Sequence, residues 1–280
     1  MEREFPAMGT DWGLRADIAD AGLLERAVEL VGELEQRLSR FLPDSALSRL
    51  NRERAVEDEL VAALVREPED VRRQTGGSFD ARIGAAVLAC GYERSFEQIA
   101  TAGPIRVDRT RPLVAIDDSR VWLSGEGLLD LGGTAKGWSV DRVADLLSQA
   151  GPCLVDGGGD IAVRGRPLGA EEWLIGVGDG LAVGLCDGAV ATSSTLRRRW
   201  RSGEGAAHHV IDPSLGRPAE GALTAVVIAP TASLADALAT ALVADAARAL
   251  PALAAVEAEA LLQFCDGRWQ MTPGMERYLR

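Results

Sequence analysis

The sequence predicts an α+β fold in which mixed or antiparallel β-sheets are flanked by helices, and it predicts a single domain over residues 1–280. Strands and helices come in mixed blocks along the chain, which disfavours a regular parallel strand–helix–strand array. Turn signals at Asp117-Asp118-Ser119 and Asp266-Gly267 predict hairpins. No repeat of fixed period and no linker rich in proline, glycine and serine divides the chain.

In the N-terminal half we expect a strand over residues 12–19 and an amphipathic helix over 21–41. Apolar residues recur in that helix at steps of three and four: Leu24, Val28, Val31, Leu34, Leu38 and Phe41. A capped turn or short helix is expected over 44–51, after Pro43. A second helix should span 57–74 and be interrupted at Pro68. A glycine loop over 76–80 and a hairpin over 113–123 follow.

In the C-terminal half, a helix should run from Lys136 to about Gln149, with Asp141 and Arg142 on its polar side. Short strands are expected over 153–155, 173–177, 181–186, 190–192 and 223–228, and another follows the glycines at 157–159 and ends at Val163. An alanine-rich helix should cover 232–250, and its Asp236 and Asp245 exclude a membrane span. The segments 260–264 and 269–271 should pair as a hairpin.

Composition limits the classes of function. The chain has 280 residues with 47% hydrophobic side chains, which suffices for a sizeable core. A net charge of −12 argues against a nucleic-acid partner, which would require a basic stripe. The cysteines show no metal-ligand spacing and are expected to be reduced core residues: Cys90, Cys153, Cys186 and Cys265. The absence of an apolar signal region, a lipobox or a long apolar run predicts a cytoplasmic protein without a transmembrane segment, unless an export signal precedes this sequence.

The stretch Asp130–Asp141 contains Lys136, the sole lysine of the chain. Its glycines would let a phosphate approach backbone N–H groups, and the start of the following helix favours negative charge. The stretch matches neither a Walker A motif nor a dinucleotide fingerprint. The alternative interpretation is compositional drift, in which one lysine survived by chance.

Asp236 and Thr240 are four residues apart, which places both side chains on one helix face. A carboxylate and a hydroxyl form a hard-oxygen pair suited to Mg²⁺. Alternatively, Asp236 caps the helix and Thr240 only packs.

Two further clusters carry polar groups. His208 and His209 are the only histidines, so a histidine general base must be one of them, although a structural role is open for both. In the loop Gly76–Asp80, Phe79 and Asp80 could contact a heterocycle, or Asp80 could form an Asx turn. The glycines at 157–159 could allow another close approach of a ligand to the backbone, or they could form only a turn. A serine-hydrolase elbow, a zincin helix and a Cys–His nucleophile pair are absent from the sequence. Together the clusters favour a metal-assisted reaction on a phosphate-containing ligand.

Read in order, these segments resemble the ApbE-type FAD:protein FMN transferases over nearly the whole chain. The stretch Asp130–Asp141 is similar to the family motif Asp-Leu-Gly-Gly-Ile-Ala-Lys-Gly-Tyr-Ala-Val-Asp. The other matching segments are Met8-Gly9-Thr10, 41–51 with Ser45, Leu47, Ser48 and Asn51, Gly77-Ser78-Phe79-Asp80, Gly158-Gly159-Asp160, Trp173-Leu174-Ile175-Gly176, Ala191-Thr192-Ser193, His209-Val210-Ile211-Asp212-Pro213 and 235–240. The resemblance implies an ApbE-like, T-fold-like architecture.

The resemblance also implies residue roles. The residues that would line the FAD site are Met8, Phe41, Ser78, Phe79, Asp80, Asp130, Lys136 and Val210. The side chains of Asp236 and Thr240, with the carbonyl of Gly133, would hold Mg²⁺. His209 would be the base that deprotonates a threonine or serine hydroxyl of a client protein.

The activity implied is Mg²⁺-dependent transfer of FMN from FAD to that hydroxyl, which forms a phosphoester and releases AMP. Alternatives are an FAD pyrophosphatase that gives FMN and AMP, and a non-catalytic FAD-binding protein. The presence of Asp236, Thr240 and His209 favours an enzyme, because flavin binding alone needs no base. The chain departs from the family pattern at Asp156, Gly180, Ser194, Thr195 and Leu196, and mildly at Thr134 and Trp138.

Overall fold

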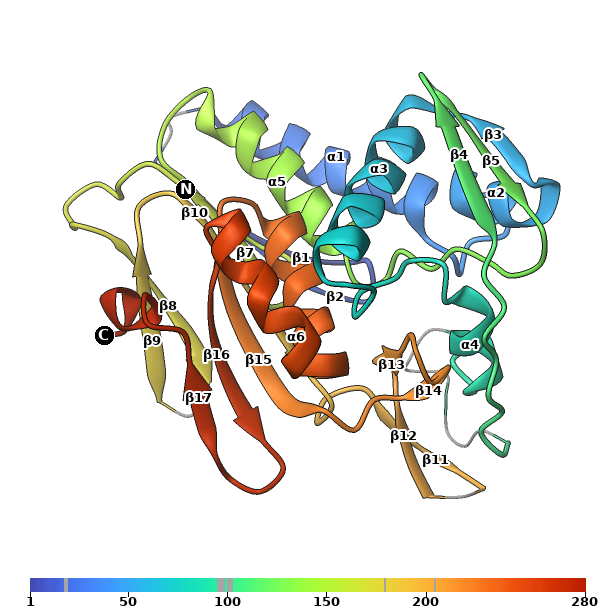
Figure 1. Ribbon diagram of the computed structural model, residues 1–280. Helices are drawn as coiled ribbons and strands as arrows, with labels where there is room; N and C mark the ends of the chain where they lie inside the picture. The colour runs from blue at the N-terminus through green and yellow to red at the C-terminus, as the bar shows by residue number, and fades with distance from the viewer. Residues whose placement is uncertain (18–19, 95–98, 100–102, 179, 204) are drawn as a thin grey trace.

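The computed structural model describes residues 1–17, 20–94, 99, 103–178, 180–203 and 205–280. Its centre is an eight-stranded sheet with the order β1-β2-β6-β7-β10-β15-β16-β17 (Figure 1). Every neighbouring pair in this sheet is antiparallel. The strands are β1 (Glu2–Ala7), β2 (Thr10–Ala16), β6 (Cys153–Asp156), β7 (Asp160–Arg164), β10 (Gly188–Ser194), β15 (Ala222–Ala229), β16 (Glu259–Phe264) and β17 (Trp269–Met271). The predicted α+β class is confirmed.

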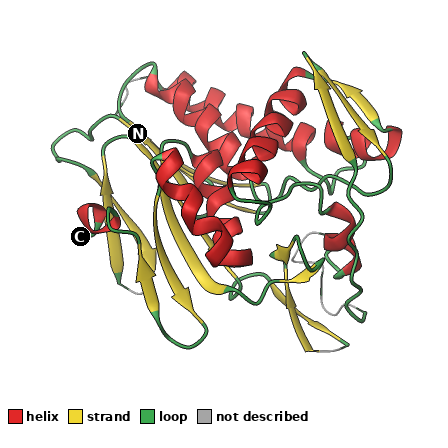
Figure 2. Ribbon diagram, viewed as in Figure 1, coloured by secondary structure: helices red, strands yellow, loops and turns green. Residues whose placement is uncertain are grey.

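Three helices cover one face of this sheet: α1 (Ala21–Leu38), α5 (Ala135–Ser148) and α6 (Ala232–Leu253) (Figures 1 and 2). Helix α6 packs on β10 and β15, and α5 packs on β7 and against α6. Apolar residues at helical spacing form the buried faces; in α1 they include Leu24, Val31 and Leu34.

The opposite face of the sheet packs on the hairpin β8 (Trp173–Gly178)–β9 (Leu181–Leu185) and on the C-terminal turn η3 (Met275–Tyr278). Alternate residues of the central strands point to this side. Val190 and Val226 lie there in contact with Ile175 and Val183 of the hairpin. The central strands are therefore buried on both faces.

A second group of elements lies beside the helices. It contains α2 (Ala46–Glu53), α3 (Glu59–Gln74) and α4 (Gly84–Ala89), and a three-stranded sheet β3-β5-β4 made of β3 (Ala55–Glu57), β5 (Arg120–Ser124) and β4 (Leu113–Asp117). Two small hairpins follow β10: β11 (Arg199–Ser202) with β12 (Gly205–His208), and β13 (Ile211–Asp212) with β14 (Arg217–Pro218). Loops from this group and the central sheet meet at the candidate site.

Most elements expected from the sequence are present, including both hairpins. The interruption expected at Pro68 is wrong: α3 continues through this residue. Its buried residues lie on both sides of Pro68, so packing of the helix offsets the missing N–H donor. Residues 18–19 of the first expected strand lie outside the described residues. The strands β1, β3 and β11–β14 were not expected; most of them are short.

By length and apolar composition alone, residues 232–256 could cross a membrane. In the fold, α6 is one of the three helices that cover the sheet, and many of its residues are in the largest hydrophobic cluster. It bends at Asp245, whose φ of −154° and ψ of 86° are not helical.

Candidate active site

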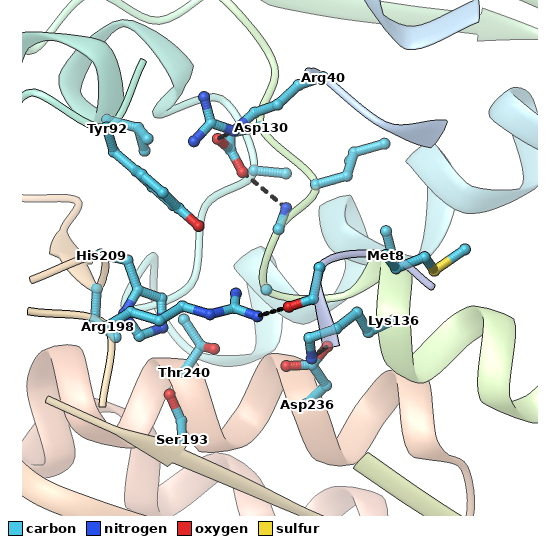
Figure 3. A pocket seen from close by; sticks show the side chains of 18 of the residues that line it. Met8, Arg40, Tyr92, Asp130, Lys136, Ser193, Arg198, His209, Asp236 and Thr240 are labelled. Atoms are coloured by element: carbon cyan, nitrogen blue, oxygen red, sulfur yellow. Dashed lines mark hydrogen bonds and ion pairs between the residues drawn. The ribbon is translucent and has the colours of Figure 1, made fainter. Parts of the chain in front are cut away.

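A cavity of about 650 Å³ lies between the N-terminal ends of α5 and α6, the β1–β2 turn, and the loops that follow α1, α3 and β12 (Figure 3). This volume is in the range of small-molecule sites. Every site residue predicted from the sequence lines it: Met8, Phe41, Ser78, Phe79, Asp80, Asp130, Gly133, Lys136, His209, Val210, Asp236 and Thr240. The fold thus brings segments from both ends of the chain to one place.

Lys136 lies in the first turn of α5 and forms an ion pair with Asp160 at the start of β7. Its Nζ is also 3.9 Å from Oδ2 of Asp236. Burial lowers the pKa of Lys136, but the two carboxylates outweigh burial and raise the pKa above its ordinary value. Lys136 is therefore a permanent positive charge inside the cavity.

Asp236 lies on the first turns of α6, one turn before Thr240, and both line the cavity. The helix cap is Thr231, whose Oγ1 accepts a hydrogen bond from the Leu234 N–H over 3.3 Å. The capping alternative for Asp236 is therefore wrong. Among the described residues, the hydrogen bond that its Oδ2 accepts comes from the Gly137 N–H over a long 3.4 Å, and this N–H is a weak partner for a buried carboxylate.

The pKa of Asp236 is raised to about 7, first by burial and then by the charge of Asp160. An under-bonded carboxylate beside a hydroxyl is a set of hard oxygen donors. Gly133 lies against Thr240, since a Cβ placed on Gly133 would be 3.2 Å from Thr240 Oγ1. The described residues contain no group of three His, Cys, Asp or Glu side chains suited to a metal. One carboxylate, one hydroxyl and one carbonyl nevertheless fit Mg²⁺, which keeps several waters.

The two histidines have different environments. The Nε2 of His208 is 3.0 Å from the Ala219 carbonyl oxygen and the side chain is buried, so this residue is structural. His209 faces the cavity and is partly exposed. Burial, and then the positive charge of Arg198, lower the pKa of His209 to about 3. His209 is therefore a neutral imidazole, able to take up a proton.

The two other predicted carboxylates are held by arginines. Asp80 accepts two hydrogen bonds of 2.9 Å from the guanidinium of Arg82. Asp130 pairs with Arg40 over 2.9 Å and accepts a hydrogen bond of 2.7 Å from the Gly132 N–H. These bonds fix both carboxylates at the cavity wall.

The other predicted residues form the apolar part of the wall. Val210 and Phe79 are buried, and Phe41 is exposed. The hydroxyl of Ser78 donates to the Thr75 carbonyl oxygen over 2.9 Å, so it shapes the loop. Met8 occupies the β1–β2 turn with a φ of +51°.

Several cavity residues were not predicted from the sequence. The guanidinium carbon of Arg40 lies 4.2 Å from the ring centroid of Phe41 and 4.5 Å from that of Tyr92. Ser193 contributes from the C-terminal end of β10, and Arg197 and Arg198 contribute from the segment that follows this strand. Because almost all of the 30 basic residues are arginine, a single arginine carries no signal in this sequence. For the ion pair of Asp160 with Lys136, the only indication in the sequence was the Gly158-Gly159-Asp160 motif.

A model of the ApbE family matches residues 8–262. The chain belongs to the ApbE family. The resemblance seen in the motifs is thereby confirmed.

Curated ApbE relatives cover most of the chain. It is 28% identical to a FAD:protein FMN transferase of Vibrio cholerae over 265 residues, which is 85% of this chain and 79% of the relative. It is 31% identical to a FAD:protein FMN transferase of Treponema pallidum over 252 residues, which is 78% of this chain and 70% of the relative.

Solved ApbE structures share the fold. The ApbE protein of Thermotoga maritima superposes with a TM-score of 0.87 at 25% identity, over 100% of this chain and 99% of that one. The flavin transferase ApbE of Vibrio cholerae superposes with a TM-score of 0.78 at 23% identity, over 99% and 98%. At 23% identity, the similarity to the Vibrio cholerae structure shows the fold alone.

Two residues that depart from the ApbE pattern, Asp156 and Gly180, lie at turns outside the cavity. Asp156 accepts a hydrogen bond of 2.8 Å from the Gly159 N–H and so closes the glycine turn between β6 and β7. Gly180, with a φ of +75°, lies between β8 and β9, on the sheet face away from the cavity. Neither residue lines the cavity.

Proposed function

We propose that this protein transfers FMN from FAD to the hydroxyl of a threonine or serine on a client protein, in a Mg²⁺-dependent reaction that forms a phosphoester and releases AMP. The observation that carries the proposal is the meeting of a neutral His209, the cation Lys136 and the oxygen pair of Asp236 and Thr240 in one cavity. Membership of the ApbE family and the names of its curated relatives support flavin transfer.

The cavity offers two environments for the two parts of FAD. The apolar surfaces of Phe41, Phe79 and Val210 suit a flat ring system. The diphosphate belongs near Lys136, whose charge is held in place by Asp160. Asp80 and Asp130, oriented by their arginines, provide acceptors at the wall.

Asp236, Thr240 and the Gly133 carbonyl would hold Mg²⁺ at the diphosphate end of the cavity. When bound, the ion supplies charge neutralisation for the phosphate oxygens. Without it, Asp236 is a buried carboxylate with a raised pKa, an arrangement that costs stability and is typical of a functional site.

In the proposed reaction, the client oxygen attacks the FMN-side phosphorus of FAD. The bond from this phosphorus to the bridging oxygen breaks, and AMP leaves with that oxygen and the bonding electrons. The hydroxyl proton moves to His209. In the free protein the pKa of His209 is too low for an efficient base at neutral pH. The negative charge of a bound diphosphate would raise this pKa towards the working range.

The test is mass spectrometry of the purified protein incubated with FAD, Mg²⁺ and a peptide carrying a Ser/Thr-Gly-Ala-Thr segment. The proposal predicts an FMN adduct on the peptide and one AMP for each adduct. His209→Gln should abolish the adduct and retain FAD binding, whereas His208→Gln, the matched control, should retain transfer. FMN and AMP without an adduct on any acceptor would indicate a pyrophosphatase, and unchanged FAD would indicate a binding protein.

A further inference from the structure

We propose that Arg198 is a further catalytic residue of this site, whose guanidinium contacts the phosphates of FAD opposite Lys136 and neutralises the charge that develops during transfer. The inference rests on the proposed function and adds to it a second protein cation. Arg198 lies between β10 and β11, far in sequence from Lys136. Both residues line the same cavity.

Figure 3 shows the Arg198 side chain running from beside His209 across the cavity towards Lys136 and Asp236. Its Nη2 donates a hydrogen bond of 3.3 Å to the carbonyl oxygen of Gly9 in the β1–β2 turn. The guanidinium therefore spans the space between the proposed base and the proposed diphosphate site.

The charges of the site agree with this position. The positive charge of Arg198 lowers the pKa of His209. This effect agrees with the place of the Arg198 side chain beside His209 in Figure 3.

The guanidinium is also available for a ligand. Arg40, another arginine of the cavity, is neutralised by Asp130. Within the described part of the chain, no carboxylate pairs with Arg198, and its side chain has one neutral acceptor, the Gly9 carbonyl. Five N–H donors in a planar fork match two phosphate oxygens, and this weakly satisfied group faces a cavity that suits an anion.

The segment that carries Arg198 is anchored by residues that depart from the family pattern. The hydroxyl of Ser194 donates to the Leu223 carbonyl oxygen (3.2 Å), contacts Thr224 Oγ1 (2.9 Å) and accepts from the Leu196 N–H (3.1 Å). The Thr195 N–H donates to the same Leu223 oxygen over 2.9 Å. A glycine at 194 would lack the side-chain bonds. Ser194 is thus a positioning residue that holds the start of the arginine segment on β15.

The chemical role is electrostatic. As the bond from the client oxygen to phosphorus forms, the bond from phosphorus to the bridging oxygen breaks, and its electron pair leaves with AMP. Negative charge accumulates on the phosphate oxygens, where a fixed guanidinium is most effective. Arg198 keeps all its protons throughout, because an arginine stays protonated in proteins.

The experiment compares Arg198→Gln, Arg198→Lys and the control Arg199→Gln, which changes an exposed arginine outside the cavity. Wild-type transfer to the peptide is measured first, and a wild-type protein that turns over no FAD contradicts the proposed function itself. With an active wild type, Arg198→Gln should lower kcat/KM by about 100-fold and Arg198→Lys by less. Arg199→Gln should stay within about twofold of the wild type.

A second readout is equilibrium binding of FAD followed by flavin fluorescence, together with the melting temperature. Arg198→Gln should weaken FAD binding about tenfold with an unchanged melting temperature, which corresponds to the loss of one charged hydrogen-bond contact. Unchanged transfer and binding in Arg198→Gln would overturn the inference. An equal loss of transfer and of melting temperature in the Gln and Lys variants would also overturn it, because Arg198 would then be structural.

Ser194 is tested by a double-mutant cycle. Ser194→Ala should slow transfer about tenfold by loosening the segment, and it should have no further effect in the Arg198→Gln background. Fully additive losses would contradict its action through Arg198.

Discussion

The carboxylate of Asp141, on α5, accepts a hydrogen bond of 2.9 Å from the backbone N–H of Ser233 at the start of α6. Its other oxygen accepts one of 2.9 Å from the Ala232 N–H. The same carboxylate pairs with Arg164 over 3.2 Å. This buried group joins the two helices whose first turns carry Lys136 and Asp236. It therefore sets the position of Lys136 relative to Asp236.

Asp141→Ala should lower the free energy of unfolding by about 3 kcal/mol, because it leaves two helix N–H groups and Arg164 without their acceptor in the interior. Urea unfolding measures this change. The matched control is Asp145→Ala, one turn further along α5, which removes a solvent-exposed carboxylate that also contacts Arg164. It should cost less than about 1 kcal/mol. Equal losses would contradict the bridging role of Asp141.

Gly137→Ala should disrupt the junction of α5 and α6. A Cβ at Gly137 would lie 2.3 Å from the Ala232 carbonyl oxygen, so two backbones must move apart. We expect a loss of about 3 kcal/mol or more in stability, together with loss of transfer. Gly32→Ala is the control, since a Cβ there meets no atom within 4 Å in an exposed position of α1. It should stabilise by about 0.5–1 kcal/mol. Similar melting curves for the two variants would refute the argument.

Asp236→Asn should raise the stability of the metal-free protein at pH 8. The raised pKa of Asp236 shows that its charged form is unfavourable in the fold, and an amide of the same shape removes that cost. A gain on the order of 1 kcal/mol corresponds to roughly 2–4 °C in melting temperature. The same variant should lose its Mg²⁺-dependent activity. Asp117→Asn, at an exposed position of β4, should change neither quantity. A destabilised Asp236→Asn would show that the carboxylate supports the fold.

His209 should make the protein sensitive to acid. Its pKa of about 3 in the folded state is below its ordinary value, so the unfolded state binds the proton more readily. Stability is lost as the pH falls through the unfolded pKa near 6.5, and the cost continues to grow down to about 3. Between pH 7 and pH 5 the loss is about 2 kcal/mol. Denaturant unfolding at both pH values should show this loss in the wild type, and His209→Gln should lose about 2 kcal/mol less. The same pH dependence in both proteins would place the acid sensitivity elsewhere.

The sequence predicted the parts of this molecule that depend on local patterns. The periodicity of α1, the hairpin signals and the ordered motifs around Lys136, His209 and Asp236 identified the main elements and the residues that line the cavity. Periodicity failed for Asp141, which was placed on the polar side of its helix. The backbone N–H groups that donate to it lie about 90 residues further along the chain, and no helical pattern reports such a contact. Arg198 was missed because arginine is abundant in this sequence. Its place in the cavity also depends on the path of the loop between β10 and β11, which no local pattern predicts.

The most direct test of the account is a crystal structure of the protein with FAD and Mn²⁺, in which anomalous scattering locates the metal. The account predicts the metal on Asp236, Thr240 and the Gly133 carbonyl, the diphosphate between Lys136 and Arg198, and the FMN-side phosphorus facing His209. A metal bound to other residues, or a diphosphate outside this cavity, would contradict it.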